Sequence, residues 1–178
     1  MDAVLAELGP PPFNSADQAI WTEWERQGMI FPESFRAFVD AYGTGDLADF
    51  LTFYHPAATD PARSLLELIN AAPDDDADMI EDGTLPHRYY PEPDGLLIWG
   101  TSSEGDRFSF RWINEDQYVI GVLLRQEFEY VELADDFDSM VMKAIRRENP
   151  WPWVDWFSGD PNWSFKMWRP RLPADGAQ

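Results

Sequence analysis

The stretch that most constrains the fold lies between residues 96 and 131. It contains four segments of strand-like sequence, namely residues 96–100, 107–112, 118–123 and 128–131. The second segment alternates aromatic and polar residues, which is the period-2 pattern of a strand with one buried face. The turns between the segments are short and polar, so consecutive strands are expected to run antiparallel. The sequence therefore predicts an antiparallel meander, and no catalytic constellation is built into it.

The clearest predicted helix covers residues 31–43, with Pro32 in its first turn and Gly43 at its end. Proline suits the first turn of a helix, where its missing N–H costs nothing, and glycine suits the left-handed cap. The apolar side chains recur at the spacing of one helical face: Phe35, Phe38, Val39 and Tyr42.

Further helices are expected before and after this one in the sequence. They cover residues 16–27, 61–71 and 137–147, and residues 51–54 form a short strand. The fold class that follows is α+β, a single domain in which helices pack on a mostly antiparallel sheet. We divide the chain into a helical extension over 1–27, a central domain over 28–147 and a Trp-rich extension over 148–178.

The charge of the chain is strongly negative. The chain has 33 acidic and 13 basic residues, which gives a formal net charge of -20 at pH 7. Such a field repels nucleic acids and anionic membranes and accelerates encounter with a basic protein. The alternative is that the charge serves solubility alone.

Several classes of site are excluded or disfavoured by the composition. The chain has no cysteine, so disulfides, thiolate metal sites and a cysteine nucleophile are absent. The two histidines, His55 and His87, lie at no ligand spacing, and no cofactor or metal is expected. The N-terminus lacks the pattern of a signal peptide, and no apolar stretch has membrane-spanning length. A soluble cytoplasmic protein is the expectation.

Residues 73–95 are predicted to form a long, loosely ordered acidic insertion. Its alternating acids resemble a calcium loop, but the glycine and the closing glutamate of such a loop are missing at the required offsets. The insertion is either a solvated loop or a docking surface for a basic partner. Its acids are Asp74, Asp75, Asp76, Asp78, Glu81 and Asp82.

The turn over residues 101–106 carries glycine but no lysine, so it is not a phosphate loop. We expect Gly105 to adopt a positive φ and the Asp106 carboxylate to accept backbone N–H bonds. Glu104, at the tip of the turn, is a candidate contact for a partner.

The C-terminal extension is rich in tryptophan and proline. It completes the core, presents aromatic anchors to a partner, or stacks on sugars or bases; the sequence leaves these alternatives open. The candidate anchors are Trp151, Trp153 and Trp156.

Two short motifs resemble those of the SUKH superfamily, which includes yeast cell-wall regulator domains and many bacterial immunity proteins. The first is the predicted helix over residues 31–43, and the second joins Trp-Gly, Gly-Asp and the aromatic strand after residue 98. The residues that carry the resemblance are Phe31, Pro32, Phe35, Trp99, Gly100, Gly105 and Asp106. The resemblance covers residues 28–147; the acidic insertion and the Trp-rich extension have no counterpart.

The resemblance implies an α+β fold and a non-enzymatic role. Bacterial members bind and neutralise a cognate polymorphic toxin, often a nuclease, so we expect an immunity protein that meets its toxin through the acidic surface. The alternative is a cytoplasmic adaptor or regulator of the same fold with no toxin partner. An enzyme would need groups from distant segments, such as His87 with Asp106 or Glu104.

Overall fold

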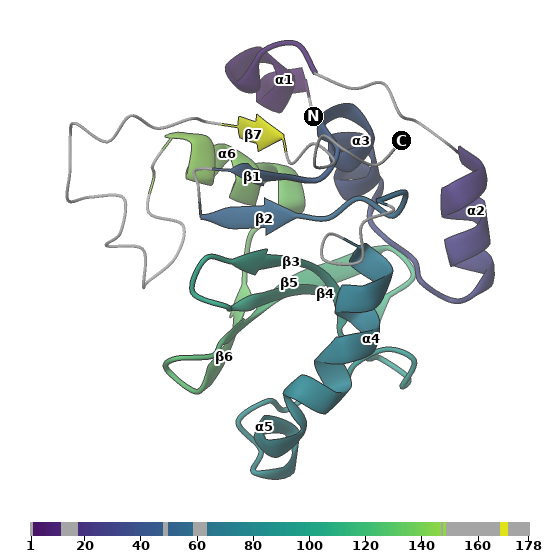
Figure 1. Cartoon of the computed structure of the whole chain (residues 1–178), viewed down its shortest axis with the longest axis vertical. Helices are drawn as coiled ribbons and strands as arrows, with labels where there is room; N and C mark the ends of the chain where they lie inside the picture. The colour runs from purple at the N-terminus through teal and green to yellow at the C-terminus, as the bar shows by residue number, and fades with distance from the viewer. Residues whose placement is uncertain are drawn as a thin grey trace, which may run out of the picture.

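The structure, a computed structural model, describes residues 2–11, 18–47, 50–58, 64–146, 148 and 168–170. At its centre is a sheet with the strand order β6-β5-β4-β3-β2-β1-β7, in which every neighbouring pair is antiparallel (Figure 1). The strands are β1 (Gly45–Leu47), β2 (Leu51–Phe53), β3 (Leu97–Ser102), β4 (Arg107–Asn114), β5 (Gln117–Leu124), β6 (Glu129–Leu133) and β7 (Trp168–Pro170).

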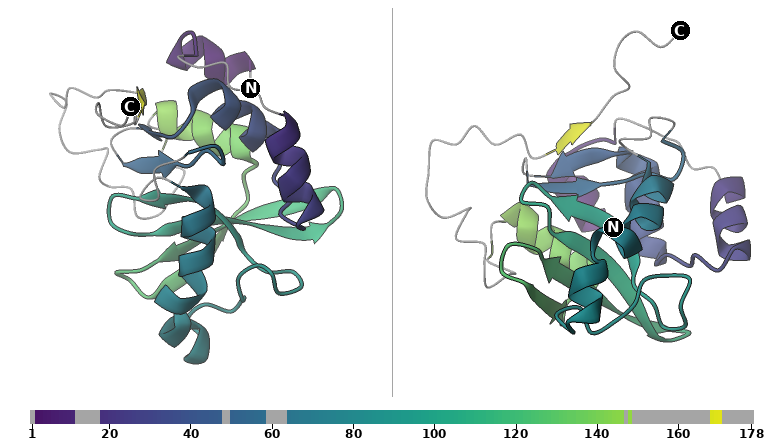
Figure 2. Two further views of the ribbon diagram at one scale, coloured as in Figure 1. Left: turned by 45° about the vertical axis from the view of Figure 1, so that its right-hand side comes forward. Right: turned by 60° about the horizontal axis from the view of Figure 1, so that its bottom comes forward.

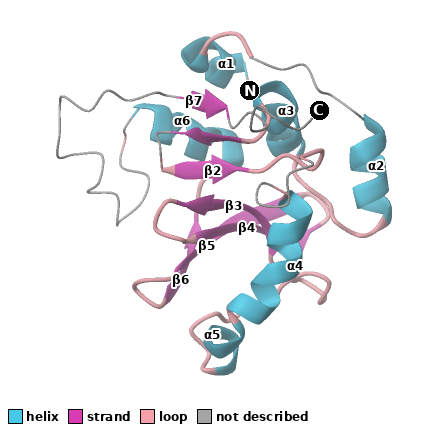
Figure 3. Cartoon of the chain, in the orientation of Figure 1, coloured by secondary structure: helices cyan, strands magenta, loops and turns pink. Residues whose placement is uncertain are grey.

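The helices flank this sheet (Figure 3). They are α1 (Asp2–Leu8), α2 (Gln18–Arg26), α3 (Glu33–Tyr42), α4 (Leu65–Asp75), α5 (Ala77–Glu81) and α6 (Phe137–Arg146). The predicted α+β class is confirmed, and so is the meander, which is the run from β3 to β6. None of the helices in these described ranges is long and apolar enough to cross a membrane.

One face of the sheet carries an aromatic core. Phe110 of β4 lies 5.5 Å, between ring centroids, from both Phe35 of α3 and Trp99 of β3. Phe137, the first residue of α6, lies 5.5 Å from Phe35 and 5.6 Å from Trp99. The helical face predicted for α3 is therefore the face that meets the sheet. Trp21 of α2 joins the same core, with its ring 6.4 Å from that of Phe35.

The opposite face of the sheet carries α4. Successive side chains of a strand point to opposite faces, so Phe108 of β4 enters the aromatic core while Arg107 points to the other side. There it forms an ion pair with Asp75 at the end of α4. Helix α4 contacts β3 through a stripe that includes the buried Leu65 and Ile69. Figure 2 shows α4 on one side of the sheet and α3 and α6 on the other.

The prediction of a loop over residues 73–95 is wrong in its first part. Helix α4 runs through Pro73 as far as Asp75, and α5 follows after one residue. The helix continues for two residues past Pro73, and Ala72 before the proline and Asp76 after the helix end are both buried. The rest of the segment is irregular apart from a single bridge between Tyr89 and Leu96.

The predicted C-terminal end of α3 and the predicted start of α6 agree with the structure, whereas the helix predicted over 61–71 is α4, Leu65–Asp75. Gly43 adopts a φ of 70° and its N–H donates to the carbonyl of Val39. The Asp136 carboxylate accepts a 2.7 Å hydrogen bond from the N–H of Ser139 and so caps α6.

Candidate functional site

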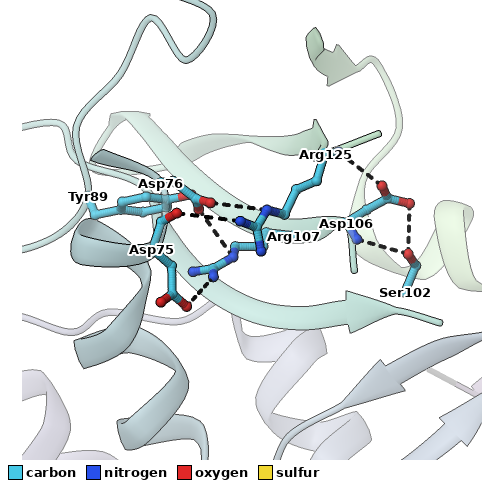
Figure 4. A network of polar contacts seen from close by, with 7 residues as sticks. All are labelled: Asp75, Asp76, Tyr89, Ser102, Asp106, Arg107 and Arg125. Carbon is cyan, nitrogen blue, oxygen red and sulfur yellow. Dashed lines mark hydrogen bonds and ion pairs between the residues drawn. The ribbon is translucent and has the colours of Figure 1, made fainter. Parts of the chain in front are cut away.

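Asp76, between α4 and α5, is the centre of a buried polar cluster (Figure 4). Its side chain is 0% exposed, and Tyr89 Oη donates a 2.7 Å hydrogen bond to Oδ2. Arg107 Nε lies 3.1 Å from Oδ2 and Arg125 Nε lies 3.2 Å from Oδ1, both as ion pairs. A buried carboxylate needs such partners, because burial without them is costly.

Asp75 extends the cluster towards solvent. Its Oδ2 lies 2.6 Å from Arg107 Nη2, and its carbonyl accepts a 3.4 Å hydrogen bond from Arg125 Nη2. The Asp75 side chain is 53% exposed, whereas that of Arg107 is only 6% exposed. Asp75 and Asp76 therefore pair with the guanidinium groups of Arg107 and Arg125, and these contacts hold the end of α4 on the sheet.

Tyr89 is held in its neutral form at this site. Burial, foremost, and the adjacent charge of Asp76 raise the pKa of the Tyr89 hydroxyl. The hydroxyl therefore remains a hydrogen-bond donor over the whole working pH range.

The turn between β3 and β4 joins the cluster through Asp106. Its Oδ2 accepts a 2.7 Å hydrogen bond from Ser102 Oγ, and its Oδ1 accepts a 3.2 Å bond from the backbone N–H of Arg125. Gly105 has a φ of 89°, as predicted. Burial raises the pKa of Asp106, and the hydrogen bonds from Ser102 and Arg125 oppose that effect.

Arg125 consequently connects three segments of the chain. Its N–H bonds to the β3–β4 turn, its guanidinium bonds to the end of α4, and it belongs itself to the turn between β5 and β6. Sequence reasoning missed Arg125, Arg107 and Tyr89 as partners of the acidic run.

The acids predicted to meet a partner do not share one environment, and Asp75 pairs with Arg107 although its side chain is 53% exposed. Asp76 is buried, so its assignment to a solvated, partner-contacting surface is wrong; Arg107 and Arg125 draw it inside the molecule. The exposed acids outside the arginine cluster, which we call the outer acids, are Asp74, Asp78, Glu81 and Asp82.

The remaining candidates are placed as follows. Glu104 is half-buried and its Oε2 accepts a 2.7 Å hydrogen bond from Gln126 Nε2. The candidate anchors Trp151, Trp153 and Trp156 lie outside the described residues.

The motif residues of the resemblance have structural roles. The side chains of Phe31, Phe35 and Trp99 are buried in the core. Gly100 lies against the neighbouring strand, since a Cβ there would stand 2.7 Å from the carbonyl oxygen of Thr52. Pro32 precedes the first helical residue of α3 and is buried.

A shallow groove runs between α4–α5 and residues 88–92. It has a volume of about 560 Å³ and an apolar floor that includes Pro73, Ala77 and Ile80. Glu81 and Glu92 line it together with Arg88. One of the outer acids, Glu81, therefore lines a groove that also offers apolar contacts.

His87 contacts a second polar group, which is formed by Arg111 of β4 and Glu132 of β6. Its Nε2 is 3.6 Å from Glu132 Oε1, which also binds Arg111 Nη2 at 2.6 Å. Burial, together with the positive charge of Arg111, lowers the pKa of His87. From the sequence, His87 and Asp106 are among the distant groups that an enzyme would need to bring together. In the structure His87 lies beside Glu132, whereas Asp106 lies beside Ser102 and Arg125.

His55 is buried near the N-terminal helices. Its Nδ1 accepts a 3.0 Å hydrogen bond from the N–H of Ala57, and its Nε2 lies 3.3 Å from Asp40 Oδ1. Trp21 Nε1 donates to the same carboxylate oxygen at 3.0 Å. The accepting Nδ1 places the imidazole proton on Nε2, towards Asp40.

The described residues contain no group of three or more His, Asp or Glu side chains that could hold a metal ion. Comparison with known proteins adds no relative: no family model, no curated protein and no solved structure matches the chain.

Proposed function

We propose that this chain is a non-enzymatic immunity protein that binds a basic toxin, such as a nuclease, in the cytoplasm and neutralises it through the outer acids. One observation carries the proposal: the acidic run is divided between a buried anchor and an exposed surface. Asp76 is fixed by two arginines, and the outer acids on both sides of it face solvent. They are therefore held as a fixed negative surface rather than on a loose tail.

The physical advantage of such a surface lies in association. Figure 1 shows α5 at the far end of α4, at the bottom of the view, and its residues Asp78 and Glu81 are exposed. With a net charge of -20 the chain repels nucleic acid and attracts proteins that bind nucleic acid through basic faces. Complementary charge accelerates the encounter and excludes partners of the same sign.

The experiment measures association with the product of the neighbouring gene, first by co-expression and pull-down and then by stopped-flow kinetics at low and high salt. The test variant neutralises the outer acids by D74N, D78N, E81Q and D82N. The control makes the same change in net charge with E33Q, E115Q, D116N and E148Q, which are exposed acids elsewhere.

We expect the test variant to associate about tenfold more slowly at low salt, with the difference closing as salt screens the charges. The control variant should lose much less. Equal rates for the two variants would show that general charge, and not the outer acids, governs association. Failure of the wild-type chain to bind and to suppress toxicity would contradict the proposed function.

A further inference from the structure

Phe128 is the most exposed large apolar side chain among the described residues. It lies in the turn between β5 and β6, and 65% of its surface is exposed. Its φ is 54°, in the left-handed region that glycine and asparagine adopt far more readily than phenylalanine. The free protein therefore keeps an aromatic residue where both its backbone and its exposure are unfavourable.

The turn that carries Phe128 is firmly held. The N–H of Arg125 bonds to Asp106, and the guanidinium of Arg125 pairs with the buried Asp76. Gln126 Nε2 bonds to Glu104 on the neighbouring turn at 2.7 Å. A side chain on such a turn is presented in a fixed position, which lowers the entropy lost on binding.

The surroundings of Phe128 are acidic. Glu127 and Glu129 flank it in the chain and are exposed, and Glu104 lies on the adjoining turn. The nearby positive charge of Arg125 is paired with Asp76. An aromatic side chain flanked by acidic residues fits an apolar pocket whose rim carries lysine or arginine.

We infer that Phe128 is the anchor by which this chain docks into an apolar, basic-rimmed pocket of a protein partner. This inference rests on the proposed function and adds the element that slows dissociation. Binding energy concentrates in a few buried aromatic contacts, and surrounding charges contribute chiefly to the association rate.

The experiment uses the full chain and the purified product of the neighbouring gene, with binding followed by surface plasmon resonance. The test variant is F128N, because asparagine accepts a left-handed φ and removes the aromatic ring. The matched control is I113N, which removes another large apolar side chain, 46% exposed, from the β4–β5 hairpin. F128Y, which keeps the aromatic ring, should bind as the wild type does.

The expected result for F128N has two opposite parts. The urea midpoint of the free protein stays the same or rises, since strain is relieved. The Kd increases about 30-fold, mostly through faster dissociation, and the salt dependence of association is retained. I113N binds as the wild type does.

Each alternative result is decisive. If F128N binds as tightly as the wild type, the anchor is overturned while the proposed function stands. If F128N lowers the urea midpoint, the fold itself uses Phe128 and the inference is overturned on that ground. If the wild-type chain shows no binding, both the inference and the proposed function fall.

Discussion

Asp76 and Asp78 are separated by one residue, yet the fold gives their carboxylates opposite surroundings. Asp76 is 0% exposed and contacts two arginines and a tyrosine, whereas Asp78 is exposed on α5. The comparison teaches that composition alone does not define an acidic surface. The position of each carboxylate on the helix decides whether it holds the fold together or meets solvent.

The helical spacing explains the difference. The buried positions of α4 and α5 recur at intervals of three and four residues, and Asp76 is one of them: Leu65, Ile69, Ala72, Asp76 and Met79. Asp78 lies off this stripe. A carboxylate on a buried stripe requires cationic partners from the facing sheet, and β4 and β5 supply them through Arg107 and Arg125.

The largest expected effect is the loss of the buried charge. The substitution D76N keeps the size of the side chain but leaves the buried Arg107 with Asp75 alone, so we expect a loss of about 3 kcal/mol of unfolding free energy. The matched control D78N removes an exposed acid and should change the unfolding free energy by less than about 0.5 kcal/mol. Urea unfolding followed by circular dichroism measures both.

Equal effects of D76N and D78N would remove the distinction between the buried and the exposed acids. A large effect of D78N would instead assign a structural role to the outer acids. The test of the outer acids as a partner surface would then be compromised by instability.

A smaller effect is expected from the hydrogen bond between Tyr89 and Asp76. Y89F removes the 2.7 Å bond to a charged group, and we expect a loss of about 2 kcal/mol. The control is Y90F, at the neighbouring position, whose hydroxyl donates to the carbonyl of Gln27 near the surface. It should cost less than about 1 kcal/mol, since the lost bond is neutral and solvent is close.

The same urea titration compares the two tyrosines. A Y89F protein as stable as Y90F would mean that the arginines alone satisfy Asp76. The cluster would then need no contribution from the irregular segment after α5.

Local sequence pattern predicts the single strands of the meander and the buried face of α3, because each of these elements is encoded within about a dozen consecutive residues. The polar cluster is encoded differently. Arg107 and Arg125 lie 32 and 50 residues beyond Asp75, and no local periodicity links them. The only local signal is the continuation of the apolar stripe through Asp76, which a helix boundary placed at Pro73 conceals.

Phe128 illustrates the same limit. Its pattern with Tyr130 predicts the first residue of a strand, but β6 begins at Glu129 and Phe128 lies in the turn. The turn contains no glycine that would indicate a left-handed residue. Contacts from Asp106 and Asp76 to Arg125 fix its position, and those contacts exist only in the folded chain.

The smallest effect concerns Asp40, which is intermediate between the two groups of acids, with 18% of its side chain exposed. Its partner His55 is buried, and burial lowers the pKa of His55 in spite of the opposing hydrogen bond and charge of Asp40. The unfolded chain, with an ordinary histidine pKa near 6.5, therefore binds a proton before the folded chain does. The contribution of His55 to the unfolding free energy is then present at neutral pH and falls as the pH drops below about 6.5.

We therefore expect the stability difference between the wild type and H55Q to decrease between pH 7.5 and 5.5, by up to about 1.4 kcal/mol for each pH unit below 6.5. Urea unfolding of both proteins at each pH measures it. Subtracting the unfolding free energy of H55Q from that of the wild type at each pH removes the contributions that both proteins share, namely those of His87 and of the large net charge. A difference that grows on acidification would mean that Asp40 outweighs burial and stabilises a charged His55. Asp40 would then act as Asp76 does, as a carboxylate that holds a buried cation, and the boundary between structural and surface acids would include it.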